Sequence, residues 1–285
     1  MTYETAVKPA APGVVGLPLR SPTLPPATHT NVWVVGHEDF IVVEPASPYA
    51  DAQTELDAVI DARLGAGHRL LGLVVTHHHA DHVGGAAWLR AKYGAPLLAH
   101  PKTAAKLKGR VTVDREVDEG DTIDPRLDAL GLQLLATPGH APGHLCLVSA
   151  PHRWAIVGDM VASVGTILID PDDDGDMDAY LTQLDRLRGL ELGSLLPAHG
   201  TPIEAPRAHL SHYIAHREAR EAKVLAALEV QALPLATLVS RAYADTPVHL
   251  WPLASKSARA HLARLARRGQ AEAVGRDWRR PQSGA

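Results

Sequence analysis

The most informative stretch of this sequence is Thr76-His77-His78-His79-Ala80-Asp81-His82. It contains the pattern H-x-H-x-D-H and follows a continuous apolar run at 70–75, which is typical of a strand buried on both faces. Alternate residues of an extended segment point the same way, so His77 and His79 can reach one metal ion. Asp81 and His82 can then reach a second. Imidazole and carboxylate are both zinc ligands, so the stretch predicts a metal site at the end of a buried strand.

Three later motifs place further metal donors after apolar runs. They read T-P-G-H at 137–140, V-G-D at 157–159 and L-P-A-H-G at 196–200, and their donors are His140, Asp159 and His199. Each donor lies just past an expected strand. We therefore expect all of them to converge on one edge of a pair of sheets.

Motifs in this order resemble those of the metallo-β-lactamase fold superfamily, over about residues 17–205. The resemblance implies an αββα sandwich with a dinuclear metal site at one edge of the sheets. It assigns a ligand set to each ion: His77, His79 and His140 would bind the first zinc, Asp81, His82 and His199 the second, and Asp159 would bridge both. Iron and manganese stay open, but related di-iron flavoproteins have Glu where His79 stands, which favours zinc.

The resemblance also implies the chemistry of a hydrolase. Two zinc ions sharing one water would generate a bridging hydroxide that attacks a carbonyl carbon or a phosphorus atom. Asp159 would hold both ions, and Asp81 would also hold or receive a proton, so these two are the catalytic candidates. Lactams, thioesters, lactones and phosphodiesters all suit such a site.

Apolar periodicity along the chain predicts an α/β fold. A hairpin is expected at 31–43, helices at 45–65, 83–92, 177–190 and 208–228, and strands at 70–75, 96–99, 130–136, 145–148, 154–157 and 194–196. We expect an αββα domain over 1–207, a connecting helix over 208–228 and a winged-helix-like domain over 229–285. The last comprises helices at 233–243 and 253–268 and a small hairpin around 271–278.

The charge of the chain is divided unevenly. From Arg217 onward it holds 12 Lys+Arg and 6 Asp+Glu, a balance of +6, although the whole chain carries −4. The sequence Y-I-A-H-R-E at 213–218 followed by a winged helix resembles the β-lactamase-like protein 2 subfamily, whose best-studied members cleave single-stranded RNA. A basic stripe on the last helix could contact phosphates or be a solvated helix face; it comprises Lys256, Arg259, Arg264, Arg267 and Arg268.

Three functions from different classes therefore stay open. The first is a hydrolase of small esters, thioesters or lactones, and the second is a single-strand-specific endoribonuclease. The third is a nucleic-acid-binding protein with a vestigial metal site. An exported β-lactamase is disfavoured because no signal peptide is evident, and glyoxalase II because its C-terminal extension is patterned differently.

The remaining composition bears on location and partners. The single cysteine, Cys146, cannot form an intrachain disulfide, and no apolar stretch approaches the roughly 18 residues of a membrane helix. We expect a cytoplasmic protein that acts on a small molecule or single-stranded RNA, without a membrane partner. The oligomeric state stays open, with a homodimer as one option.

Local departures from the family pattern concern three positions. Glu44 stands where relatives commonly have an Asp that orients a metal-binding histidine, and its extra methylene makes a different geometry necessary. His144 is expected to support His140 from behind, and His78 to point away from the metals.

The sequence D-P-D-D-D-G at 170–175 matches the start of an EF-hand loop, but its twelfth position is Leu181 instead of Glu. We therefore expect no calcium site there, but a loop near the active-site mouth.

Overall fold

The computed structural model describes residues 8–282, which form two compact units. The first unit contains residues 8–138, 143–167 and 190–207, and the second contains 139–142, 168–189 and 208–282. The units are not consecutive in sequence, because two internal segments group with the C-terminal part. No helix among residues 8–282 has the length and apolarity needed to cross a membrane.

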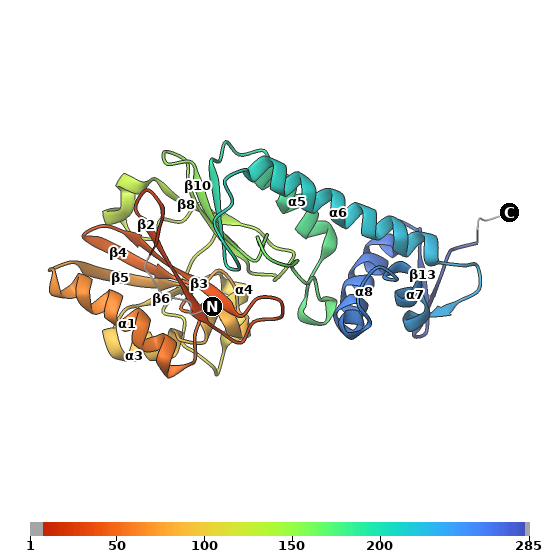
Figure 1. Ribbon diagram of the computed structural model, residues 1–285, viewed down its shortest axis with the longest axis horizontal. Coiled ribbons are helices and arrows are strands. Elements are labelled where there is room, and N and C mark those ends of the chain that lie inside the picture. Colours follow the sequence, from red (N-terminus) through yellow and green to blue (C-terminus); the bar gives the residue numbers. More distant parts are fainter. Residues whose placement is uncertain (1–7, 283–285) are drawn as a thin grey trace. The chain divides into compact units, whose positions relative to one another are not determined.

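The first unit is built on a seven-stranded sheet with its strands in chain order. β1 to β4 pair antiparallel, whereas β4 to β7 pair parallel and are joined by helical crossovers. The strands are β1 (Lys8–Ala11), β2 (Val14–Arg20), β3 (His29–Gly36), β4 (Asp39–Val43), β5 (Arg69–Val74), β6 (Leu97–Ala99) and β7 (Arg115–Glu116). The helices between them are α1 (Ala50–Gly65), α2 (Ala80–Val83), α3 (Ala86–Tyr93) and α4 (Pro101–Leu107). In Figure 1, α1 and α3 lie along one face of this sheet.

A second sheet of four strands, in the order β11-β10-β9-β8, packs on the other face. Its strands are β8 (Leu132–Ala136), β9 (Leu145–Ser149), β10 (Trp154–Gly158) and β11 (Ser194–Pro197). β3 shows how the core is divided: Val32 and Val34 face α1 and α3, whereas Trp33 and Val35 face the second sheet. Strands buried on both faces explain the continuous apolar runs.

The expected hairpin at 31–43 is confirmed as the antiparallel pair β3–β4. The expected helix at 45–65 begins only at Ala50, because Pro45 and Pro48 disfavour helical backbone before it. The β1–β2 hairpin and α4 were not anticipated. β2 carries Gly16 and Pro18, which weaken its strand signal.

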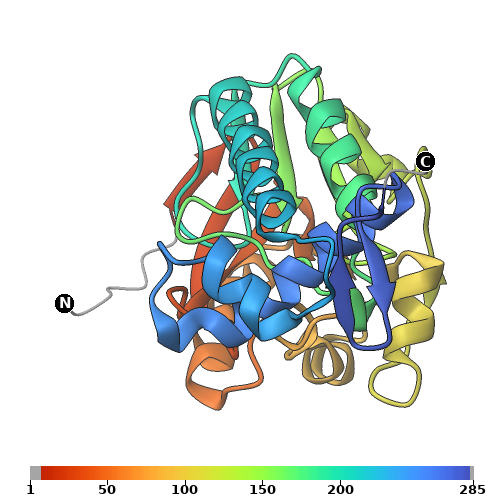
Figure 2. The ribbon, with the colours of Figure 1, turned by 90° about the vertical axis from the view of Figure 1, so that its right-hand side faces the viewer.

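The second unit contains four helices, α5 (Met177–Arg188), α6 (Pro206–Ala227), α7 (Leu235–Ala242) and α8 (Trp251–Arg267), of which α6 begins at the unit boundary. A small sheet, β12-β14-β13, is formed by β12 (Leu233–Pro234), β14 (Asp277–Arg279) and β13 (Glu272–Val274). Val224, Leu238 and Leu262 share one apolar core, which joins α6, α7 and α8. Figure 2 shows α7, α8 and the small sheet in blue and α6 in teal. The winged-helix expectation is confirmed.

Candidate metal centre

Four strands deliver polar side chains to one edge of the first unit. Glu44 follows β4, and Thr76 follows the run that contains β5; these strands are parallel neighbours, so both residues leave at the same edge. Asp159 and His199 likewise follow the parallel strands β10 and β11. The strand ends thus bring Asp159 and His199 together, with 3.3 Å between Oδ1 and Nε2, and the convergence of the full donor set stays a prediction.

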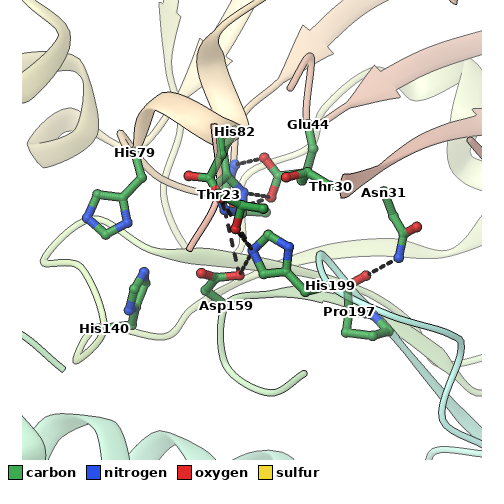
Figure 3. Close-up of polar contacts among 12 residues, drawn as sticks. Thr23, Thr30, Asn31, Glu44, His79, His82, His140, Asp159, Pro197 and His199 are labelled. Atoms are coloured by element: carbon green, nitrogen blue, oxygen red, sulfur yellow. Dashed lines mark hydrogen bonds and ion pairs between the residues drawn. The ribbon is translucent and has the colours of Figure 1, made fainter. Parts of the chain in front are cut away.

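His82 is completely buried between carboxylates (Figure 3). Its Nδ1 lies 3.0 Å from Glu44 Oε1. Its Nε2 lies 3.6 Å from both Asp81 Oδ2 and Asp159 Oδ1, which is too far for a hydrogen bond. One ring nitrogen is thus held by Glu44, and the other faces two carboxylates.

His199 approaches the same two carboxylates from the β11 side. Its Nε2 lies 3.4 Å from Asp81 Oδ2 and 3.3 Å from Asp159 Oδ1, while its Nδ1 is 3.1 Å from the His29 carbonyl oxygen. Donation from Nδ1 to that carbonyl directs Nε2 toward the carboxylates. The ligand atoms of Asp81, His82 and His199 all lie within 4.8 Å of one another.

These spacings fit a divalent cation. Ligand atoms roughly 2.1 Å from a tetrahedral ion lie about 3.4 Å apart, close to the 3.3–3.6 Å between the imidazole Nε2 atoms and the carboxylate oxygens. Two imidazoles and two carboxylates are also donors that zinc accepts. The donor set and its geometry therefore fit the metal that the sequence predicts.

The charges of the cluster depend on one another. Burial raises the pKa of Asp81, but the rings of His82 and His199 outweigh burial and lower it to about 2. Burial lowers the pKa of His199, but Asp159 and Asp81 outweigh it and raise the value to about 10. His82 and Asp159 shift in the same directions as His199 and Asp81, respectively. Without metal, protonated imidazoles thus balance the carboxylates, a role that a cation takes over when it binds.

His77 and His79 lie together at the start of the motif. His77 Nε2 is 2.9 Å from His79 Nδ1, and Thr76 Oγ1 lies 2.9 Å from His77 Nδ1. His78 is buried, and its ring centroid is 4.7 Å from that of His79. The first unit therefore brings together six of the seven predicted ligands. His140 belongs to the second unit, and its membership of the set stays a prediction.

His144 contacts the backbone of Asp159, and its expected support of His140 stays a prediction. Its Nε2 accepts a hydrogen bond of 3.1 Å from the Asp159 amide, and its Nδ1 lies 2.7 Å from Thr137 Oγ1. Because Nε2 accepts, Nδ1 carries the proton and donates to Thr137. Gly158 permits this packing: a Cβ there would lie 2.5 Å from His144 Nε2, and its φ is +45°.

Asn31 is a positioning residue that the sequence reasoning missed. Its Nδ2 donates to Pro197 O at 2.9 Å (Figure 3) and to Gly200 O at 2.8 Å. Its backbone amide donates to Ala198 O at 2.7 Å. These bonds hold the backbone on both sides of His199. The available signal was a buried amide side chain in the otherwise apolar run of β3.

Comparison with known families agrees with this fold and site. Residues 25–199 match the metallo-beta-lactamase superfamily, and residues 235–278 match the beta-lactamase-associated winged helix domain. The chain therefore belongs to the metallo-beta-lactamase superfamily.

Among curated relatives, the chain is 28% identical over 210 residues to a beta-lactamase-like protein 2 homolog of Caenorhabditis elegans, covering 70% of this chain and 66% of the relative. It is 37% identical over 123 residues to a hydroxyacylglutathione hydrolase of Rhodopseudomonas palustris (strain HaA2), covering 41% and 46% of the two chains. The matches thus span less than two thirds of these relatives. Among solved structures, a beta-lactamase domain protein from Burkholderia ambifaria superposes with a TM-score of 0.82 at 22% identity, covering 99% of this chain and 95% of that one.

Proposed function

We propose that this protein is a dinuclear zinc hydrolase that acts on a small ester, thioester or lactone. The proposal rests on one buried cluster. In it, carboxylate oxygens of Asp81 and Asp159 each lie 3.3–3.6 Å from the Nε2 atoms of both His82 and His199. His77, His79 and, from the second unit, His140 complete the proposed ligand set.

Two divalent ions in such a site would lower the pKa of a shared water and polarise the substrate oxygen. The side chains of this protein prepare the site for them. Glu44 orients His82 through Nδ1, the His29 carbonyl orients His199, and His144 holds the Asp159 backbone. We assign Asp81 as the group that would hold or receive a proton, because its Oδ2 faces the Nε2 atoms of His82 and His199 at 3.6 and 3.4 Å in the buried cluster.

Two observations favour a small-molecule substrate. A hydroxyacylglutathione hydrolase, by its name an enzyme that hydrolyses an acylglutathione, is 37% identical to this chain over 123 residues. The basic stripe that suggested RNA binding is occupied by carboxylates of the same unit: Lys256 Nζ is 2.7 Å from Asp170 Oδ2, and Arg264 Nε is 2.6 Å from Asp178 Oδ1. Paired cations release few counterions on binding a polyanion.

The test is a metal assay with a substrate panel. Purified protein is analysed for zinc, iron and manganese, then assayed with a glutathione thioester, a lactone, a cephalosporin, bis(p-nitrophenyl) phosphate and a single-stranded RNA oligomer. We expect about two zinc ions per chain and turnover of the thioester or lactone. Asp159→Ala should abolish both zinc binding and turnover, whereas Asp128→Ala, at an exposed position, should change neither. Efficient RNA cleavage without thioester or lactone turnover would overturn the proposal in favour of the endoribonuclease, and zinc without any turnover would indicate a vestigial site.

A further inference from the structure

The basic face of α8, defined by Lys256, Arg259, Arg264, Arg267 and Arg268, meets an acidic segment of its own unit, residues 168–178 (elements labelled in Figure 1). Arg259 Nη2 lies 2.7 Å from Asp172 Oδ1, and Arg267 Nη2 lies 2.9 Å from Asp176 Oδ1 and 2.7 Å from Asp178 Oδ2. Lys256 pairs with Asp170, and Arg264 pairs with Asp178. Four carboxylates of the acidic segment therefore contact the basic face of α8. The basic face is therefore paired with carboxylates, while the side chains of Lys256, Arg259, Arg267 and Arg268 stay 38–47% exposed.

The acidic segment has a defined internal structure. Asp170 Oδ1 accepts from the Asp172 amide at 3.1 Å, and Asp176 Oδ1 caps α5 by accepting from the amides of Asp178 and Ala179 at 2.8 and 3.1 Å. The Gly175 amide donates to Asp170 O at 2.8 Å. The carboxylates of the EF-hand-like sequence thus serve as helix caps and ion-pair partners.

The same segment holds the histidine loop, residues 139–142. His140 Nδ1 donates to Leu168 O at 2.8 Å, and the Asp176 amide donates to Gly139 O at 2.8 Å. Gly139 has φ of +138°, and a Cβ there would lie 2.3 Å from the Tyr180 backbone, so the loop sits directly on the start of α5. Donation from Nδ1 to a carbonyl selects the imidazole tautomer whose Nε2 can bind a metal.

We infer that α8 is a positioning element for His140. Its basic face holds the acidic segment, the segment holds the histidine loop, and the winged-helix module thereby supports one metal ligand. This inference rests on the proposed metal centre, in which His140 binds the first ion. A single exposed ion pair contributes little, so the support comes from the set of pairs acting on one segment.

The test removes three exposed pairs and leaves the buried Arg264 in place. In metal-free Lys256→Gln/Arg259→Gln/Arg267→Gln protein, the Asp176 amide, whose acceptor is Gly139 O, should exchange with deuterium at least several-fold faster than in the unaltered protein. Zinc titration should show about a tenfold weaker binding step for one ion, with the other unchanged. General destabilisation would weaken both steps. Arg279→Gln, which removes the Arg279–Glu272 pair in the same module, is the matched control and should alter neither readout.

A pair of charge reversals tests whether the attraction between opposite charges holds the acidic segment. Arg259→Asp should speed deuterium exchange at the Asp176 amide. Adding Asp172→Arg should restore the exchange rate of the unaltered protein. The inference would be overturned if the triple variant kept the deuterium exchange rate of the Asp176 amide and the affinities of both zinc-binding steps. It would also be overturned if the triple variant lost RNA binding without any change in that exchange rate. Absence of zinc from the unaltered protein would instead refute the proposed function, and the exchange experiment on metal-free protein would still report on the positioning.

Discussion

At the scale of single residues, Glu44 shows how this chain adapts the family pattern. Its side chain is fully buried, and its backbone has φ of +60°, which is uncommon for a non-glycine residue. The carboxylate reaches His82 Nδ1 and also accepts hydrogen bonds from the Thr76 hydroxyl and amide. Glu44 thus reaches His82 Nδ1 despite its extra methylene, and we expect it to orient His82, the role that the resemblance gives to an Asp.

Glu44→Gln tests this role. An amide is a weaker acceptor for the His82 N–H and carries no charge to support it, so zinc affinity at one position should fall about 10- to 100-fold. Isothermal titration with zinc measures the change. The exposed Glu38→Gln should bind zinc as the unaltered protein does. Equal zinc affinity in Glu44→Gln would show that Glu44 does not position His82.

Gly158→Ala tests the packing behind Asp159. An added Cβ would lie 2.5 Å from His144 Nε2 and 2.7 Å from Thr76 Oγ1, so the Asp159 backbone must move. We expect at least a hundredfold loss of activity, because small displacements of a catalytic group are costly. Gly94→Ala is the control: it also has positive φ, +66°, but open space around its Cβ position. Comparable losses in both variants would indicate backbone strain instead of packing as the cause.

At the scale of elements, parallel pairing decides which motifs meet. The pairs β4–β5 and β10–β11 send Glu44, Thr76, Asp159 and His199 to one edge. In the second unit, α8 and the start of α5 are joined by charge instead of apolar packing alone. Asp178 is central there, because Arg264, Arg267 and Arg268 all contact it.

The pH dependence of Asp178→Asn tests that junction. Burial raises the pKa of Asp178, but Arg267 and Arg264 outweigh it and hold the pKa below its ordinary value of 3.8. A group with a lowered folded-state pKa contributes stability above its unfolded value and loses it as pH falls through the folded value. The unaltered protein should therefore melt at a higher temperature than Asp178→Asn at neutral pH, and the difference should vanish as the pH falls through the lowered pKa of Asp178. Asp185→Asn, on the solvent side of α5, should show a smaller difference at every pH.

At the scale of the whole molecule, binding of zinc at the proposed site is linked to the stability of the fold. Ligands that bind only the folded state raise its stability by mass action. Zinc at about 100 times its dissociation constant should contribute about 2.7 kcal/mol, a rise in melting temperature of roughly 5–10 °C for a chain of this size. Scanning calorimetry with and without a chelator measures this rise. Asp159→Ala should lose most of it, and an equal rise in that variant would place the stabilising zinc elsewhere.

The superfamily, the winged helix and the metal motifs could be predicted from the sequence, because strand-end motifs keep their spacing along the chain. The contacts of Asn31 and the contact of His144 with Asp159 could not, since the partners, Pro197, Gly200 and Asp159, are distant in sequence. The basic stripe illustrates the same limit: its residues were identified correctly, but the carboxylates that neutralise it lie about 90 positions earlier.

The sequence by itself determined the donor types, their order and the strands that carry them, because apolar periodicity and ligand chemistry are local properties. Only the tertiary structure decided which carboxylate faces which imidazole, that Glu44 reaches His82, and that α8 is paired with residues 170–178. These are contacts between distant segments, and their geometry follows from sheet pairing and helix packing, which no local pattern encodes.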